Sequence, residues 1–522
     1  MTNRQSAHDN KGQGDVSEAK PISGQPIPAE SKQDDRLAST SSASTGAHGH
    51  AAPSIAGGQR AAMMAVLLFG SFTALMAETF LNNALPTIMG AFGVTQAAAQ
   101  WLTTAYLLVV GLMIPMSAWV FESFNLRTTF VTLMAVFFVG SLVCVFAPNF
   151  WVLLAGRIVE AAAAGGLMPF IQNVILMMFP PDKRGLAMGV TGLVIGFGPA
   201  VGPTISGLIL KVSGFRTLFA ILAAASVVAV LLALPLVRNI TSPARGTTDV
   251  ISFAESILGF GLMLYALSEV GNTGHVTLVL AVAFVLGVAI MALFCVRQLR
   301  LAKPLLDVRV FANVRFDLCT LLSTISNIAM VGIELVLPLY LQTTRGESAL
   351  TSGLVMMPGA LVMVACNPIS GVLYDRLGIR RLSLFGFVML LAGSVPMLWF
   401  SAKTSLALIG LCYALRMVGI SFTMMTTFTA GINMSAAGLA AHANAASSTV
   451  RQIGGSLGTA LAMLVISLAA VSWASAGRAA AQAIGYNWGF ILMVVFALIG
   501  LVASCFLPGA SAEHKAVAAA SR

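Results

Sequence analysis

Charged residues are scarce in this chain. Only 9% of its 522 residues are Asp, Glu, Lys or Arg, whereas 57% are hydrophobic, and the mean hydropathy is +0.89. Soluble domains carry about a quarter charged residues, so the composition excludes a soluble enzyme. We therefore expect a protein that lies mostly within a lipid bilayer.

Cysteines, metal-ligand clusters and nucleotide-binding motifs are also few or missing. The six cysteines lie in or beside apolar runs, none forms a CxxC pair, and no His cluster has the spacing of metal ligands. We therefore expect no disulfide framework and no metal site, and we interpret the cysteines as small packing residues. The phosphate-binding motif GxxxxGK(S/T) is absent from the sequence, so ATP is not expected to drive the protein.

Long apolar runs, by contrast, fill most of the chain after residue 60. Residues 1–60 are rich in Ser, Gly, Ala and Gln and carry 12 of the 48 charges, which predicts a disordered cytoplasmic tail and not a signal peptide. Each later run is about as long as the roughly 20 residues of a transmembrane helix. Fourteen spans are predicted, at 62–82, 101–121, 128–147, 151–179, 186–210, 215–237, 251–270, 276–297, 318–342, 351–373, 382–400, 405–432, 446–472 and 487–507.

The loops between these spans differ in positive charge. Thirteen Lys and Arg residues lie in loops on the side of the N-terminal tail, and five lie in the opposite loops. Because cytoplasmic loops are enriched in Lys and Arg, both termini are predicted to be cytoplasmic. The net charge of +10 is accordingly interpreted as a topology signal and not as a nucleic-acid site. The short outer loops leave no room for a ligand-binding domain, which disfavours a receptor.

Polar landmarks recur at an offset of about 255 residues, as in a duplicated helical bundle. The recurring pairs are Glu78 with Glu334, Pro86 with Pro338, Glu122 with Asp375, Arg157 with Arg416, and Gly198 with Gly454. The spans at 251–270 and 276–297 have no counterpart in this scheme. The predicted fold is therefore an all-α integral membrane protein with six plus two plus six helices. The expected domains are a tail (1–60), an N-terminal six-helix bundle (61–240), two extra helices (251–297), a C-terminal six-helix bundle (312–508) and a second cytoplasmic tail (509–522).

Several ionisable residues lie within the predicted spans, where each costs about 2.5 to 3.5 kcal/mol to insert and so indicates function. Glu78, with Asn82 one turn later, is predicted to line a central cavity. Arg157 and Glu160 stand three residues apart on one helical face and can neutralise each other, and a purely structural ion pair is the alternative. Glu334 repeats the position of the first acid, with a buried structural carboxyl as the alternative.

Two further arginines lie in the second half of the chain. We expect Arg416 and Arg451 to tie second-half helices to carbonyls or acids, and we favour this structural role over a role in transport. The small residues and prolines of the fifth span predict close helix packing and a kink. A generic helix contact is the alternative. The key positions of this span are Gly192, Gly196, Gly198, Pro199 and Gly202.

The loop at 371–381 places one acid and three arginines at a predicted cytoplasmic turn. Such a cluster can clamp helix ends in one conformation and release them in another, or it can merely enforce topology. Its residues are Gly371, Asp375, Arg376, Gly378, Arg380 and Arg381.

Together these features resemble the major facilitator superfamily and, within it, the 14-span drug:proton antiporters of the EmrB/QacA type. The resemblance covers essentially residues 60–508 and includes ETFLNNALPTI at 78–88, the fourth-span Arg157 and the glycines of the fifth span. It is supported by the segments at 346–359 and 448–461. A weaker resemblance links the chain to lincomycin-resistance-like exporters of Gram-positive bacteria.

Three departures from the family pattern affect the candidate site. Glu160 and Ala161 replace the usual Gln-Gly, and Glu78 stands where Asp is common. The first-half loop motif keeps Glu122 and Arg127 but has lost its glycines.

The resemblance implies a proton-coupled multidrug exporter that moves lipophilic, often cationic compounds by alternating access, driven by the proton gradient without a cofactor. Glu78 and Glu160 would load protons, and Arg157 would tune their pKa. An exporter of a specific amino acid, siderophore or antibiotic is the alternative, and a non-transporting membrane sensor is disfavoured. The expected location is the inner membrane of a bacterium. The expected partners are small molecules, protons and the bilayer, without nucleic acid, and a periplasmic adaptor is left open.

Overall fold

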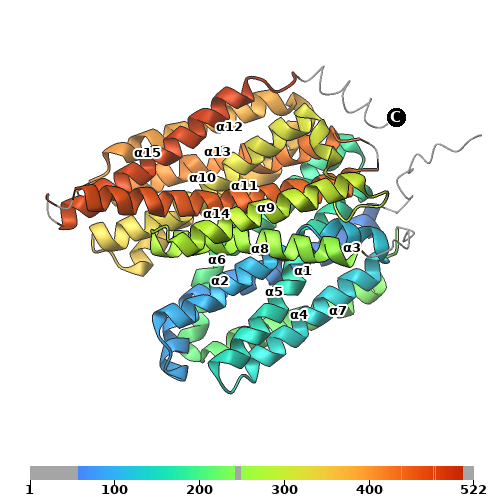
Figure 1. Cartoon of the computed structure of the whole chain (residues 1–522), viewed down its shortest axis with the longest axis horizontal. Helices are drawn as coiled ribbons and strands as arrows, with labels where there is room; N and C mark the ends of the chain where they lie inside the picture. Colours follow the sequence, from blue (N-terminus) through green and yellow to red (C-terminus); the bar gives the residue numbers. More distant parts are fainter. Residues whose placement is uncertain are drawn as a thin grey trace, which may run out of the picture. The chain divides into compact units, whose positions relative to one another are not determined.

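The computed structural model describes residues 57–240 and 249–509, except positions 402, 437, 474, 476 and 477. Within these residues all regular structure is helical (Figure 1). The predicted tails at 1–60 and 509–522 therefore lie almost entirely outside the described residues. The predicted all-α fold is confirmed for the described part of the chain.

Seven α-helices form the first part of the chain that the structure describes. They are α1 (Gly57–Phe92), α2 (Gln96–Met113), α3 (Ser117–Ser123), α4 (Leu126–Val145), α5 (Phe150–Met178), α6 (Arg184–Val212) and α7 (Phe215–Leu236). Short polar side chains fix two of their starts, because Thr95 and Asn149 accept hydrogen bonds from the first backbone N–H groups of α2 and α5.

Eight helices follow. They are α8 (Val250–Thr273), α9 (Leu278–Arg300), α10 (Val314–Leu339), α11 (Ala349–Leu377), α12 (Ile379–Ser394), α13 (Leu406–Asn433), α14 (Ala440–Ser472) and α15 (Arg478–Ser504). Gly378 separates α11 from α12 with a φ of 76°, a conformation that side-chain-bearing residues rarely adopt.

Each of the fourteen predicted spans overlaps one of these helices, with α2 and α3 together matching the second span. Within the described residues, twelve helices are long and apolar enough to cross a membrane, or thirteen if α2 and α3, bent by 52°, form one span. The other long helix is α6, whose apolar stretch covers only Arg184–Gly198 although its 29 residues extend about 43 Å. The number of fourteen crossings therefore stays a prediction.

Helix α15 begins at Arg478 rather than near residue 487, and two further helix boundaries also differ clearly from the predicted ones. Helix α1 continues to Phe92 rather than ending near residue 82, and it contains Pro86. Helix α14 begins at Ala440 rather than near residue 446. In both places polar residues lower the local hydropathy, but the segment packs against other helices, which lets polar groups and a proline remain within a helix.

The same helix contacts recur in the two halves of the chain. In the first half α4 packs against α5 and α7, and α1 packs against α6. In the second half α12 packs against α13 and α15, and α10 packs against α14. One large apolar cluster fills the first half and continues onto α9, α10, α13 and α14, and a second cluster lies within the second half. This correspondence agrees with a duplicated bundle, while the domain boundaries stay a prediction.

The halves meet along two different seams. On one side α6 packs directly against α11. In the duplicated scheme α2 corresponds to α11 and α14 corresponds to α6. On this second side, however, α8 lies between α2 and α14 and packs against both of them (Figure 1). Helix α9 packs against α8, and most of its residues are not buried inside the protein. The predicted extra helices thus include one that lies at the junction of the halves.

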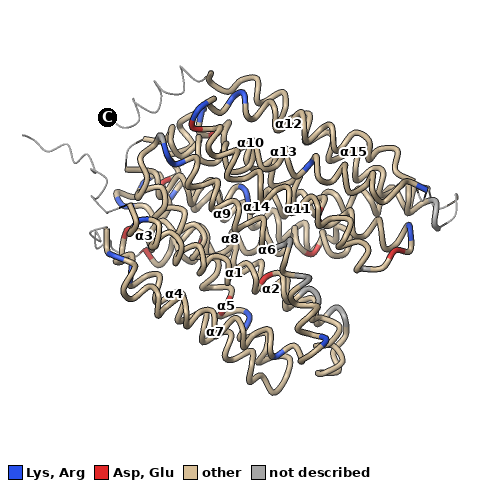
Figure 2. The backbone as a smooth tube through the Cα atoms, turned by 180° about the vertical axis from the view of Figure 1, so that it is seen from behind, with Lys and Arg blue, Asp and Glu red and all other residues tan. Residues whose placement is uncertain are grey.

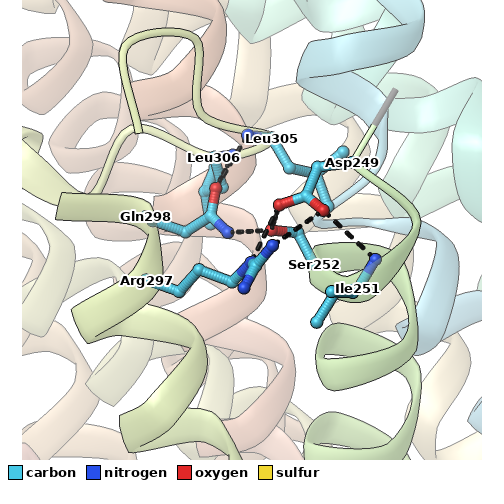
Figure 3. A network of polar contacts seen from close by, with 7 residues as sticks. All are labelled: Asp249, Ile251, Ser252, Arg297, Gln298, Leu305 and Leu306. Carbon is cyan, nitrogen blue, oxygen red and sulfur yellow. Dashed lines mark hydrogen bonds and ion pairs between the residues drawn. The ribbon is translucent and has the colours of Figure 1, made fainter. Parts of the chain in front are cut away.

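A polar network joins the neighbouring ends of α8 and α9 (Figure 3). Arg297 donates to both carboxylate oxygens of Asp249, at 2.8 and 3.0 Å. Ser252 donates to the same carboxylate, and Gln298 connects Ser252 to the backbone N–H of Leu305. The hydrogen bonds from Arg297 lower the pKa of Asp249 to about 2.

Candidate functional site

A cavity of about 470 Å³ lies where helices of both halves meet. Its walls come from α1, α2, α5 and α6 of the first half, from α10, α13 and α14 of the second half, and from α8. Most of the lining residues are apolar. Figure 2 shows that charged residues gather mainly at helix ends, so the few charges beside this cavity stand out.

The two acids predicted to be equivalent both reach this cavity. Glu78 lines it from α1 and Glu334 lines it from α10. Asn82 lies on the helical backbone of α1, but its side chain is outside the described residues. The lining also contains Gln172 and Asn272, from α5 and α8. No sequence signal indicated these two amides, because single polar residues are common in membrane helices.

Arg157 and Glu160 form a fully buried ion pair beside the cavity. Their Nη1 and Oε2 atoms are 2.7 Å apart, and the side chains are 1% and 0% exposed. Arg157 also donates to the carbonyl of Ala77 at 3.2 Å and lies 3.9 Å from the ring centroid of Tyr106. Ser141 donates to Glu160 at 2.5 Å. The pair joins α5 to α1, α2 and α4, and neither member lines the cavity.

Arg416 confirms the structural tie that the sequence indicates. Its guanidinium is buried and donates to the carbonyl of Ala329 at 2.9 Å and to the hydroxyl of Ser394. It therefore connects α13 to α10 and α12. Like Arg157, it holds the first helix of its own half through a backbone carbonyl.

The same expectation is wrong for Arg451. No described carbonyl or acid accepts a hydrogen bond from its guanidinium, which instead lies over the ring of Phe428 at 4.7 Å from the centroid. Among the described residues, its hydrogen bond to a neighbouring helix is made by the backbone, because Asn327 donates to its carbonyl oxygen at 3.0 Å. Arg451 lines the cavity. The difference arises from tertiary packing, because α13 presents the ring of Phe428 there and not an acid.

The glycines of the fifth predicted span lie on α6 and permit two close helix contacts. Gly192 and Gly196 face α11, where Asn367 donates to the carbonyl of Gly192 at 2.6 Å. Gly198 and Gly202 face α1. A side chain at position 202 would overlap the side chain of Thr79 on α1. The side chain of Pro199 lies outside the described residues.

Asp375 of the predicted clamp caps the first turn of α6. Its carboxylate accepts hydrogen bonds from the N–H groups of Gly185 and Leu186, both at 3.0 Å. A carboxylate is favourable at the N-terminus of a helix. Gly371 allows the close approach, because an added side chain would overlap the Gly185 carbonyl.

The arginines of this loop are exposed. They are Arg376, Arg380 and Arg381. The loop therefore links the halves through its acid and a glycine, while its arginines remain at the surface.

Further contacts between the halves lie near the ends that the charge bias predicts to be cytoplasmic. Asn444 donates to Asn173 at 2.6 Å. His442 has its Nε2 3.2 Å from a carboxylate oxygen of Glu122 and accepts a hydrogen bond from the N–H of Asp307. The sequence feature that could have indicated these contacts is the polar run that begins α14. The hydropathy profile assigned this run to a loop.

The comparisons with known proteins agree with this architecture. The family model of the Major Facilitator Superfamily matches residues 67–459. The chain belongs to the major facilitator superfamily. It is 41% identical over 445 residues to the uncharacterized MFS-type transporter YcnB of Bacillus subtilis (strain 168), which covers 85% of this chain and 94% of that protein.

Two other similarities bear on this superfamily member. It is 34% identical over 452 residues to the lincomycin resistance protein LmrB of Listeria monocytogenes, covering 85% of this chain and 96% of that protein. It shares the fold of the human organic anion transporter MFSD10 with a TM-score of 0.59 and 14% identity, over 84% of this chain and 99% of the other. The chain is thus a multi-pass membrane transporter and not an enzyme.

Proposed function

We propose that this transporter exports lipophilic, often cationic compounds in exchange for protons. The observation that carries the proposal is the largely apolar cavity into which each half contributes one acid, Glu78 from α1 and Glu334 from α10. Apolar walls favour lipophilic compounds, and carboxylates within a membrane protein are typical of proton and substrate pathways. The energy source in this proposal is the proton gradient, without a cofactor.

Coupling in this scheme follows from competition at Glu78. An ionised Glu78 attracts a cation, whereas a protonated Glu78 does not, so drug and proton exclude each other at this position. Arg157 contacts the carbonyl of the preceding residue, Ala77, and so connects Glu78 to the buried Glu160. Proton loading at Glu160 stays a prediction, since its carboxylate is enclosed between α4 and α5.

Alternating access would require the seam between α6 and α11 to open and close. The capping of α6 by Asp375 is a contact that such a motion would break and remake. Drug export is further supported by the similarity to LmrB, a protein named for lincomycin resistance.

The test is transport into proteoliposomes that carry an imposed pH gradient. We expect uptake of the cationic dye ethidium to require the gradient and to stop when a protonophore is added. Glu78→Gln keeps the size of the side chain but cannot titrate, so it should abolish uphill transport. Glu347→Gln makes the same change in a loop and serves as the control. Uphill transport by Glu78→Gln at the wild-type rate would place the coupling site elsewhere.

The proposal also places both termini in the bacterial cytoplasm, which reporter fusions test. Reporters inserted at 211–214 and 403 should lie outside, and reporters at 240–248 and 303 should lie inside. An outside signal at 303 would contradict the crossing of both α8 and α9.

A further inference from the structure

Arg451 is the only Lys or Arg among the described residues that line the cavity. Its Nη1 atom is buried and has no hydrogen-bond partner in the described part of the chain. No described acid forms an ion pair with it. Its contact with the ring of Phe428 holds one face of the guanidinium and leaves N–H donors unused.

Ser448 supplies a second unused donor at the same wall. It lies one turn before Arg451 on α14, lines the cavity and is 3% exposed. Its hydroxyl has no partner among the described residues. The hydroxyl of the next residue, Thr449, does donate, to the carbonyl of Ala445 at 2.7 Å. Residues three apart share a helix face, so the two unused donors are neighbours.

The charges around the cavity do not match a simple cation. The two acids, Glu78 and Glu334, attract positive charge, but Arg451 repels it. The buried Nη1 group of Arg451 is unfavourable without a partner, because it has lost its hydration and gained no acceptor. A ligand with an anionic group would remove this deficit.

We infer that Arg451 and Ser448 form an anion-binding subsite that takes the carboxylate of a transported compound. The carboxylate would accept hydrogen bonds from the guanidinium and the hydroxyl, while a basic amine of the same compound is attracted by Glu78 or Glu334. The substrate class is then amphoteric and lipophilic rather than purely cationic. This inference rests on the proposed function, since it assigns the substrate class of the same cavity.

Two dyes that differ in a single group provide the test. Rhodamine 110 carries a carboxylate, and rhodamine 123 is its methyl ester. Calorimetric titration of the purified full-length protein in detergent gives a Kd for each dye. We expect Arg451→Gln to raise the Kd of rhodamine 110 about tenfold more than that of rhodamine 123, because a charge-assisted hydrogen bond is lost. Ser448→Ala should shift the same ratio in the same direction by less.

Two further variants separate binding from folding. Arg451→Lys keeps the positive charge and should retain most of the preference for the carboxylate. Arg300→Gln removes an arginine from the exposed end of α9 and should leave the ratio of the two Kd values unchanged.

The outcomes distinguish this inference from the proposed function. An equal change of both Kd values in Arg451→Gln would assign the arginine a packing role and overturn the subsite. Binding of the ester without the acid by the wild-type protein would also overturn it, but would leave the proposed export of cations intact. Binding of neither dye would contradict both.

Discussion

Arg157 and Arg416 lie on corresponding helices of the two halves, α5 and α13, but only Arg157 is paired with an acid. Each guanidinium donates to a backbone carbonyl on the first helix of its own half. Three residues further on, Glu160 neutralises Arg157, whereas Gly419 occupies that place after Arg416. The first half therefore buries a neutral pair, and the second half buries a single cation.

The packing of the neighbouring helix explains why the second half has no acid there. A side chain at Gly419 would overlap the carbonyl of Gly386 and the N–H of Leu390, both on α12. In the first half α4 places Gly140 against the backbone of Glu160 and offers Ser141 as a hydrogen-bond donor. The comparison shows that the duplicated scaffold keeps the arginine contact, while an acid is accommodated only where the partner helix leaves space.

The largest effect is expected when the neutral pair of the first half is broken. Glu160→Ala leaves Arg157 buried without its anion and should lower the free energy of unfolding by about 3 to 5 kcal/mol. Replacing both residues, as Arg157→Met with Glu160→Ala, should restore much of this loss. Denaturant unfolding in detergent measures both, and a single variant as stable as the wild type would contradict the role of the pair.

A smaller loss is expected where the second half excludes a side chain. Gly419→Ala should destabilise the protein by about 1 to 3 kcal/mol, because the added methyl group meets backbone atoms of α12. Gly166→Ala on α5 is the matched control, since its methyl group would meet only side-chain carbons of Leu133 at ordinary contact distance. Equal stability of the two alanine variants would mean that α12 and α13 can move apart enough to accept the added methyl group at little cost in stability.

Much of this comparison could be predicted from the sequence. Hydropathy located a helix for each of the fourteen predicted spans, and the spacing of Arg157 and Glu160 predicted their pairing because residues three apart share a face. The recurrence of Glu78 at Glu334 predicted two cavity acids. These features depend on local spacing or on repetition, which a sequence displays directly.

Other features depend on which helices become neighbours, and the sequence does not display that. Hydropathy marked α8 as an extra span but could not place it between α2 and α14. Arg451 was expected to find a carbonyl or an acid, but α13 presents Phe428 at that position. The contact of His442 with Glu122 joins residues 320 positions apart, and the polar run that begins α14 does not indicate which residue His442 will meet.

The two cavity acids extend the comparison of the halves to function. Glu334→Gln should lower the affinity for a cationic dye roughly tenfold without loss of stability, because a neutral side chain is cheaper to bury. Uphill transport should persist at a reduced rate if Glu78 carries the coupled proton. Equilibrium binding and gradient-driven uptake of ethidium measure the two quantities. Complete loss of coupling in Glu334→Gln with coupling retained in Glu78→Gln would assign the coupled proton to Glu334 instead of Glu78.

The smallest effect is expected at an ion pair that belongs to neither half. Asp249 and Arg297 are 22% and 33% exposed, in contrast to the fully buried pair at Arg157 and Glu160, so water weakens their attraction. Arg297 lowers the pKa of Asp249 from 3.8 to about 2, so the pair stabilises the folded protein above pH 4 and ceases to do so as the pH falls through 2. Asp249→Asn should therefore melt at a slightly lower temperature than the wild type at pH 6, and the difference should disappear near pH 2. A difference that stays constant over this range would mean that Asp249 acts through its cap on α8 and not through its charge.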